Sequence, residues 1–92
     1  MNMLLDTNRY RDYGKGNREV LERMRASETV YLSYISLAEL RAGFRCGSRS
    51  AENERHLQLF LAKNSVGTLF ADDPTTHHFA RLYRQLRQQG TL

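Results

Sequence analysis

The fold of this chain is decided near its start by Met3-Leu4-Leu5-Asp6-Thr7-Asn8, a short apolar run that ends in an acidic residue. Residues 2–5 have no polar face, which is typical of a strand in the centre of a parallel sheet. A second strand is predicted over residues 30–33 and a third within residues 65–71. Helical patterns separate these strands, so we predict an α/β fold with a parallel sheet and right-handed crossovers.

Four helices are predicted from capping residues and apolar spacing. Residues 9–16 are expected to form a turn-rich connection with at most one helical turn. The expected helix starts are Asn17, Ser36, either Ser48 or Ser50, and Asp73 with Pro74 at the first helical position. The second of these helices is expected to end at Gly47 in a left-handed conformation, and the last at Gly90. The inward positions of the last helix are predicted to be Phe79, Tyr83 and Leu86.

Composition limits the chain to one small domain. Of its 92 residues, 40% are hydrophobic and 26% charged, and no apolar run approaches the ~20 residues of a membrane span. One cysteine, Cys46, and the lack of an export signal predict a cytoplasmic protein. The net charge is +4, and only two of the 14 basic residues are lysines. Such an arginine-rich balance suits nucleic acid, although a basic solvated surface explains it equally well.

Two acidic residues follow the first two predicted strands. Asp6 ends the first strand, and Glu39 lies one turn into the helix after the second. If these strands are neighbours, ~4.8 Å apart, both carboxylates overhang one sheet edge and could share Mg²⁺ or Mn²⁺. The alternative for Asp6 is a cap on the turn. The alternative for Glu39 is a capping box with Ser36, in which the glutamate bonds the amide of the first residue.

These motifs resemble those of a known family. Residues 3–8, then Ser36-Leu37-Ala38-Glu39-Leu40-Arg41-Ala42-Gly43, then residues 79–91, are similar in order to a PIN domain of the VapC toxin type. The resemblance implies an RNA-cleaving endonuclease that uses Mg²⁺ or Mn²⁺. It also implies a homodimer that is neutralised by a cognate VapB-type antitoxin, whose tail enters an acidic pocket.

The resemblance assigns roles to individual residues. Asp6 and Glu39 match the first two acidic catalytic and metal-binding residues, with Thr7, Asn8 and Ser36 supporting the motifs. Asn8 is expected to hold the loop by hydrogen bonds, and Thr7 to offer oxygen toward the metal. The candidates for RNA contact are the arginines near these motifs, Arg9, Arg11, Arg41 and Arg45.

The sequence departs from the family pattern at its C-terminus. The family's third acid follows the turn near Gly90, and its sheet has strand order 3-2-1-4-5. We therefore expect residues 1–92 to form one incomplete PIN-like domain with order 3-2-1, without strands 4 and 5. Weak or absent cleavage is expected. The exposed edge of the first strand is expected to pair with another chain, giving a homodimer or strand-paired oligomer.

Three other functions are consistent with parts of the sequence. The main alternative is a non-catalytic interaction module, derived from a PIN domain, that dimerises or binds antitoxin. Charge alone also allows a plain nucleic-acid-binding module, whose RNA binding would be salt-sensitive and indifferent to Asp6. Phosphoryl transfer of the haloacid dehalogenase kind requires a second aspartate two positions after the first, where this chain has Asn8.

Overall fold

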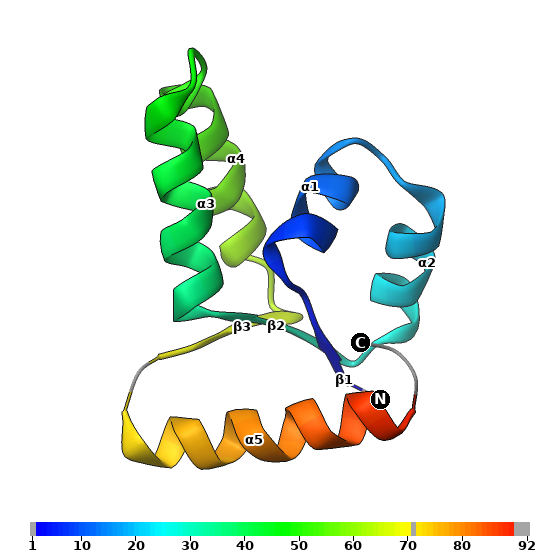
Figure 1. The fold of residues 1–92 in the computed structure, drawn as a ribbon. Coiled ribbons are helices and arrows are strands. Elements are labelled where there is room, and N and C mark those ends of the chain that lie inside the picture. Colours follow the sequence, from blue (N-terminus) through cyan, green and yellow to red (C-terminus); the bar gives the residue numbers. More distant parts are fainter. Residues whose placement is uncertain (1, 71, 90–92) are drawn as a thin grey trace.

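The computed structural model describes residues 2–70 and 72–89. They form three layers, in which a small parallel sheet lies between helices on either side (Figure 1). The strands are β1 (Asn2–Leu4), β2 (Thr29–Ser33) and β3 (Val66–Leu69). Both pairings are parallel, and the strand order is β1-β2-β3. The predicted α/β class and the predicted order 3-2-1 are therefore confirmed.

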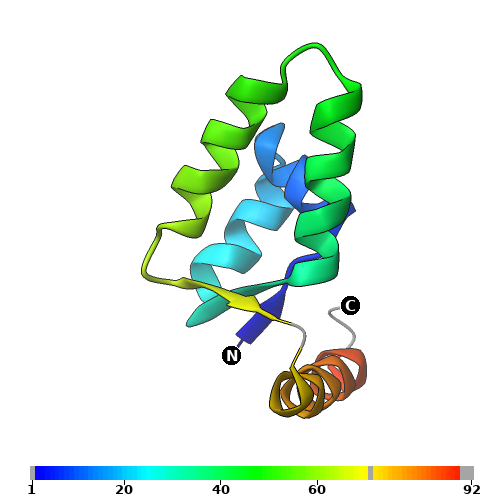
Figure 2. The ribbon, with the colours of Figure 1, turned by 90° about the vertical axis from the view of Figure 1, so that its left-hand side faces the viewer.

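Five helices cover the sheet unequally. Figures 1 and 2 show α5 across one face of the sheet and the other helices on the opposite face. Their bounds are α1 (Thr7–Gly14), α2 (Arg18–Ala26), α3 (Tyr34–Cys46), α4 (Ser50–Leu61) and α5 (Asp73–Gln88). Of the residues described, no helix is long and apolar enough to cross a membrane.

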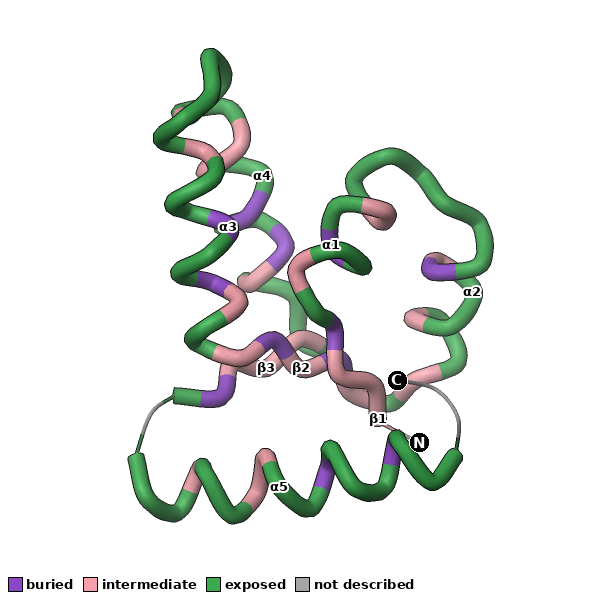
Figure 3. Tube along the Cα trace, in the orientation of Figure 1, coloured by how far each residue is buried: buried purple, intermediate pink, exposed green. Residues whose placement is uncertain are grey.

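The strands divide their side chains between two apolar clusters. Figure 3 marks buried positions on the strands and on helices of both faces. Met3 and Leu5 of the first strand pack in the larger cluster, beneath α1–α4. Leu4, between them, packs in the smaller cluster beneath α5, because successive side chains of a strand point to opposite faces. Among the described residues, the largest fully buried side chains lie in the larger cluster: Leu5, Leu32, Leu40, Leu57 and Phe60. The main core therefore lies on the four-helix side.

The predicted connection at residues 9–16 was wrong, because a two-turn helix begins at Thr7. Asp6 caps this helix, and Tyr10 is its buried residue. The chain then turns at Gly16, whose φ of +79° is the left-handed conformation that glycine adopts without strain. Asn17 caps α2 as predicted, since its side chain accepts a hydrogen bond from the Val20 amide.

The other helix starts differ from prediction by one to three residues. Ser33 rather than Ser36 caps α3. This helix ends at Gly47 as predicted, but the predicted left-handed conformation is wrong, because the Gly47 backbone is extended with a φ of −105° and a ψ of 178°. Neither predicted serine caps α4, because Arg49 occupies the cap position without a side-chain hydrogen bond. Asp72 rather than Asp73 caps α5, where its carboxylate accepts from the Thr75 amide. The predicted end at Gly90 lies outside the described residues.

The inward face of α5 was predicted partly wrongly. Leu82 and Leu86 are its buried residues, with Phe79 packed against them. Tyr83 is 40% exposed. Helical residues advance about 100° each, so Leu82 lies on the same face as Phe79 and Leu86, while Tyr83 lies at the margin. Phe79 and Tyr83 still stack, with ring centroids 6.1 Å apart.

The position of the main core can be tested on α4 with two leucines. Leu57 is completely buried, whereas Leu59 is 63% exposed. We expect Leu57→Ala to lower the free energy of unfolding by about 2–5 kcal/mol, because it leaves a cavity. Leu59→Ala should change it by less than about 0.5 kcal/mol. Urea unfolding followed by circular dichroism measures both, and equal losses would contradict this core.

Candidate functional site

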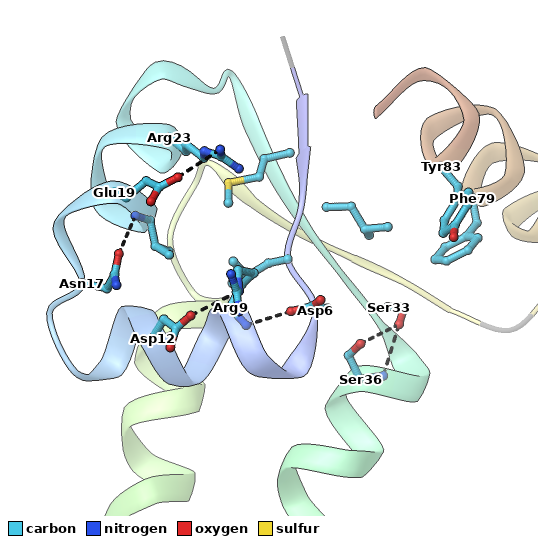
Figure 4. Close-up of a pocket in the computed structure, with 14 residues that line it drawn as sticks. Asp6, Arg9, Asp12, Asn17, Glu19, Arg23, Ser33, Ser36, Phe79 and Tyr83 are labelled. Carbon is cyan, nitrogen blue, oxygen red and sulfur yellow. Dashed lines mark hydrogen bonds and ion pairs between the residues drawn. The ribbon is translucent and has the colours of Figure 1, made fainter. Parts of the chain in front are cut away.

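A cavity of about 570 Å³ lies along the open edge of β1 and around its carboxyl end (Figure 4). Residues of β1, α2 and α5 form its length, and the starts of α1 and α3 close one end. The lining residues are Met3, Leu4, Leu5, Asp6, Arg9, Asp12, Asn17, Glu19, Val20, Arg23, Ser33, Ser36, Phe79 and Tyr83. Two of the predicted site residues, Asp6 and Ser36, and one predicted RNA contact, Arg9, thus lie together.

Asp6 is positioned by the strand before it and the helix after it. Leu5 is completely buried, and its amide donates to the Tyr31 carbonyl at 2.8 Å, so the chain leaves the sheet at a fixed point. Asp6 Oδ1 then accepts from the Arg9 amide at 2.7 Å and caps α1. The predicted alternative of a capping role is confirmed for Asp6. This role leaves the second carboxylate oxygen outside the cap bond.

Ser33 and Ser36 form the neighbouring part of the site, at the end of β2. The Ser36 amide donates to Ser33 Oγ at 3.1 Å, and the two hydroxyls are also 3.1 Å apart. Ser33 therefore caps α3 as Asp6 caps α1. Because β1 and β2 are neighbours, both helix N-termini lie at the carboxyl edge of the sheet. Free amides and helix dipoles make such a place favourable for anions.

Glu39 lies outside this cavity, on the exposed surface of α3. Its side chain has no hydrogen bond or ion pair with the rest of the described chain. The capping-box alternative is wrong, because the cap of this helix is Ser33 and Glu39 therefore lies beyond its first turn. Over residues 2–70 and 72–89, no three acidic, histidine or cysteine side chains are grouped as a metal site. A shared ion between Asp6 and Glu39 thus stays a prediction.

The two supporting residues of the first motif, Asn8 and Thr7, lie in different environments. Asn8 is exposed on α1 and its side chain makes no hydrogen bond to the described chain, so the predicted loop-holding bonds are absent there. Thr7 Oγ1 is enclosed by protein without a hydrogen-bond partner in the part described. A buried hydroxyl of this kind is normally satisfied by bound water or an ion. The Thr7 hydroxyl and the Asp6 carboxylate are the chemical type of ligand that Mg²⁺ and Mn²⁺ accept, but Thr7 is not among the residues that line the cavity.

The predicted RNA contacts are in four different environments. Arg9 lines the cavity, and its Nε lies 3.2 Å from Asp12 Oδ2. Arg41 is bound through Nε and Nη2 to Glu54 of α4, at 3.0 Å each. Arg11 reaches toward Gly43 of α3, and Arg45 is exposed at the end of that helix. Among these four arginines, Arg9 alone therefore lies beside Asp6.

A second groove, of about 840 Å³, lies between α1, α3 and α4. Tyr10 and Tyr13 of α1 pack on Phe60, with ring centroids 5.3 and 5.1 Å away, and Lys63 Nζ lies 3.1 Å from the Tyr13 hydroxyl. Desolvation by burial raises the pKa of Tyr10, with smaller contributions from Tyr13 and Glu54. These rings hold α1 against α4.

Sequence reasoning missed several residues of the cavity. Glu19 and Arg23 of α2 form an ion pair at 3.1 Å, and their four-residue spacing is a recognisable signal. The cap role of Ser33 could also have been predicted, because Ser33-x-x-Ser36 fits a capped helix start. Phe79 and Tyr83 reach the cavity from α5, and nothing local in the sequence shows that this helix lies beside β1.

Comparison with known proteins supports the fold. No protein-family model matches the chain, and no curated protein matches it. A chain of VapBC2 from Rickettsia felis, solved in a crystal structure bound to a DNA fragment from the promoter, is similar in structure with a TM-score of 0.68. The match covers 100% of this chain and 71% of that chain at 23% identity. At this identity the likeness establishes the fold, which is the predicted partial PIN-like one.

The capping role of Asp6 can be separated from its charge. We expect Asp6→Ala to lower the free energy of unfolding by about 1 kcal/mol, because it leaves the Arg9 amide without its acceptor. Asp6→Asn retains an acceptor oxygen, so it should cost only a few tenths of that. Thermal unfolding of both variants measures the difference. If the two variants were equally destabilised, the hydrogen bond at Arg9 would not be the cause.

The Arg41–Glu54 contact predicts an acid-dependent contribution to stability. Hydrogen bonds from Arg41 chiefly lower the pKa of Glu54 below its ordinary value. This contribution to stability is therefore fully present at pH values above the ordinary carboxyl pKa. It is lost as the pH falls through the lowered pKa of Glu54. We expect Arg41→Gln to raise the pKa of Glu54 in an NMR titration, whereas Arg25→Gln, on α2, should leave it unchanged. An unchanged pKa of Glu54 in Arg41→Gln would contradict the contact.

Proposed function

We propose that this chain is the nuclease component of a toxin–antitoxin pair, a metal-dependent endoribonuclease that hydrolyses RNA phosphodiester bonds. The observation that carries the proposal is the position of Asp6. Its carboxylate lines a cavity at the carboxyl end of β1, where the N-termini of α1 and α3 meet. In open α/β sheets, ligands bind at this edge. The fold shared with a chain of VapBC2 supports the same proposed function.

The chain's own residues supply three elements of such a reaction. Asp6 and Glu39 would hold Mg²⁺ or Mn²⁺, which when bound activates water and offsets charge on the phosphate. The free amides at the starts of α1 and α3 attract a phosphate group and orient it. Arg9, at the rim beside Asp6, is placed to pair with a second phosphate of the strand. Two carboxylates with water can hold Mg²⁺ only weakly, so we expect slow cleavage.

The partners in this proposal are RNA as substrate, a cognate VapB-type antitoxin and a second copy of the chain in a homodimer, all in the cytoplasm. The similar structure is a complex named VapBC2, bound to promoter DNA. We extend the pairing with an antitoxin to this chain by analogy of fold. The net charge of +4 supports an anionic partner.

A second candidate is a non-catalytic interaction module with the same fold. Two observations favour it. One oxygen of Asp6 is already used as a helix cap, and the described residues contain no group of three metal-binding side chains. Such a module would bind an antitoxin or a second copy, and it would not cut RNA.

The two candidates are distinguished by cleavage of a fluorescently labelled single-stranded RNA in Mn²⁺. We expect slow cleavage that a chelator stops and that Asp6→Asn or Glu39→Gln each lower by at least about tenfold. Glu52→Gln is the matched control, since Glu52 is an exposed acid in the first turn of α4. Cleavage that persists in Asp6→Asn would overturn the proposed site. No cleavage, with retained partner binding, would establish the interaction module.

A further inference from the structure

The helix α5 carries three arginines on the side that faces away from the sheet. Leu82 and Leu86 are its buried residues and pack in the smaller cluster. Residues advance about 100° each around a helix, so Arg84 points opposite to these two leucines. Arg81 and Arg87 lie about 60° to either side of Arg84 by the same spacing. All three arginines are exposed, and we call them the α5 basic face.

The α5 basic face lies apart from the candidate site. Figures 1 and 2 show α5 as the outermost layer on its side of the sheet. A strand beside either edge of the sheet would lie in the sheet layer, so it would not cover a face turned away from that layer. The three arginines line neither the cavity that contains Asp6 nor the groove between α1, α3 and α4.

The charges of the α5 basic face are not neutralised by nearby acids. None of the three arginines pairs with an acid in residues 2–70 and 72–89. The two acids at this helix, Asp72 and Asp73, lie at its start, and Asp73 is beside His77 at 3.7 Å. Like charges three residues apart on a helix repel each other. A bound anion would therefore relieve a repulsion that the described chain leaves in place.

The helix dipole explains only part of this arrangement. A cation in the last turn of a helix is favourable, and Arg87 lies in the last turn of α5. The dipole effect falls off within one turn, so it does not account for Arg81 and Arg84. The α5 basic face thus has more positive charge than the stability of the helix requires.

The surroundings of these arginines indicate the kind of anion. A membrane does not suit α5, because the apolar side that would enter the lipid already packs on the sheet. A protein interface is centred on apolar or aromatic anchors. The side chains between the arginines are Ala80, His77 and Gln88, which supply no such anchor. A polar face with arginine alone as its cation is instead typical of phosphate recognition.

We propose that the α5 basic face binds the phosphate backbone of RNA outside the cleavage site. The inference rests on the proposed function only in taking RNA as the polyanion. Successive arginines are separated by about 4.5 Å along the helix axis, so the face spans about 9 Å and can contact neighbouring phosphates of one flexible strand. Phosphate contacts fix the position of a nucleic acid and carry no sequence information. The face would therefore hold RNA on the protein whatever its sequence.

The test measures RNA binding without cleavage. A short single-stranded RNA labelled with fluorescein is titrated with the protein in EDTA, and fluorescence anisotropy is followed at about 50 to 200 mM salt. The slope of log K against log salt is about −0.7 for each phosphate contact with a single strand. We expect the double variant Arg81→Gln/Arg84→Gln to bind at least about fivefold more weakly and to make the slope shallower by about 1.4.

Two further double variants serve as controls. Arg25→Gln/Arg55→Gln removes the same charge from exposed positions of α2 and α4, on the opposite face of the sheet, and should retain the affinity and the slope of the wild type. Arg81→Lys/Arg84→Lys keeps the charge and loses the planar fork, so it should keep the slope and bind more weakly than the wild type. All substituted side chains are exposed, and circular dichroism checks that each variant is folded.

Three results would overturn the proposal. The first is equal loss of affinity and slope in Arg81→Gln/Arg84→Gln and Arg25→Gln/Arg55→Gln, which would mean that any basic surface suffices. The second is a wild-type protein without salt-sensitive RNA binding. The third is tighter binding of duplex DNA than of RNA, which would make DNA the partner. Because EDTA removes the metal, failure to cleave RNA would overturn the proposed nuclease and not this inference.

Discussion

The structure depends on the hydrogen bond and burial at Leu5. Its amide is bound to Tyr31 and its side chain is completely buried in the larger cluster. This fixes the end of β1 and hence the start of α1, because Asp6 follows directly. It also sets the direction of every peptide group in β1, so the N–H and C=O of Leu4 point away from β2. The position of the candidate site is therefore a consequence of one anchored residue.

The two faces of the sheet are held with different strength. The larger cluster joins α1–α4 and contains the largest fully buried side chains of the described residues. The smaller cluster has three buried leucines, Leu69, Leu82 and Leu86, with Leu4, Tyr31 and Phe79 packed against them. Hydrophobic stabilisation scales with buried apolar area, so α5 is the layer most easily displaced. Phe79 and Tyr83, which line the cavity from α5, therefore lie in the least stable part of the fold.

The apolar runs of the sequence were sufficient to locate the strands, and the family resemblance supplied their order. The sequence was less reliable at helix starts, where two capping residues lie close together. Asp72 and Asp73 are both good caps, and only the backbone at Asp72 decides between them. The first helix was missed because it has a single buried residue, Tyr10, and no apolar stripe. Local patterns detect strong periodicity, and α1 has little.

The candidate site was predictable only in part, for a similar reason. The sequence placed Asp6 and Glu39 after neighbouring strands, and the structure agrees for their backbone positions. Whether these two side chains approach each other depends on helix phase, which is the direction in which each residue points around the helix axis. The phase of α3 is set by Ser33, which begins the helix three residues before the predicted Ser36. With that phase, Glu39 is exposed and lines no part of the cavity that contains Asp6.

The cap on α1 and the proposed metal role of Asp6 are compatible. An ionised carboxylate has two oxygens and about four lone-pair sites, and the Arg9 amide uses one. The cap bond also holds the carboxylate at the cavity, which lowers the entropy lost on binding an ion.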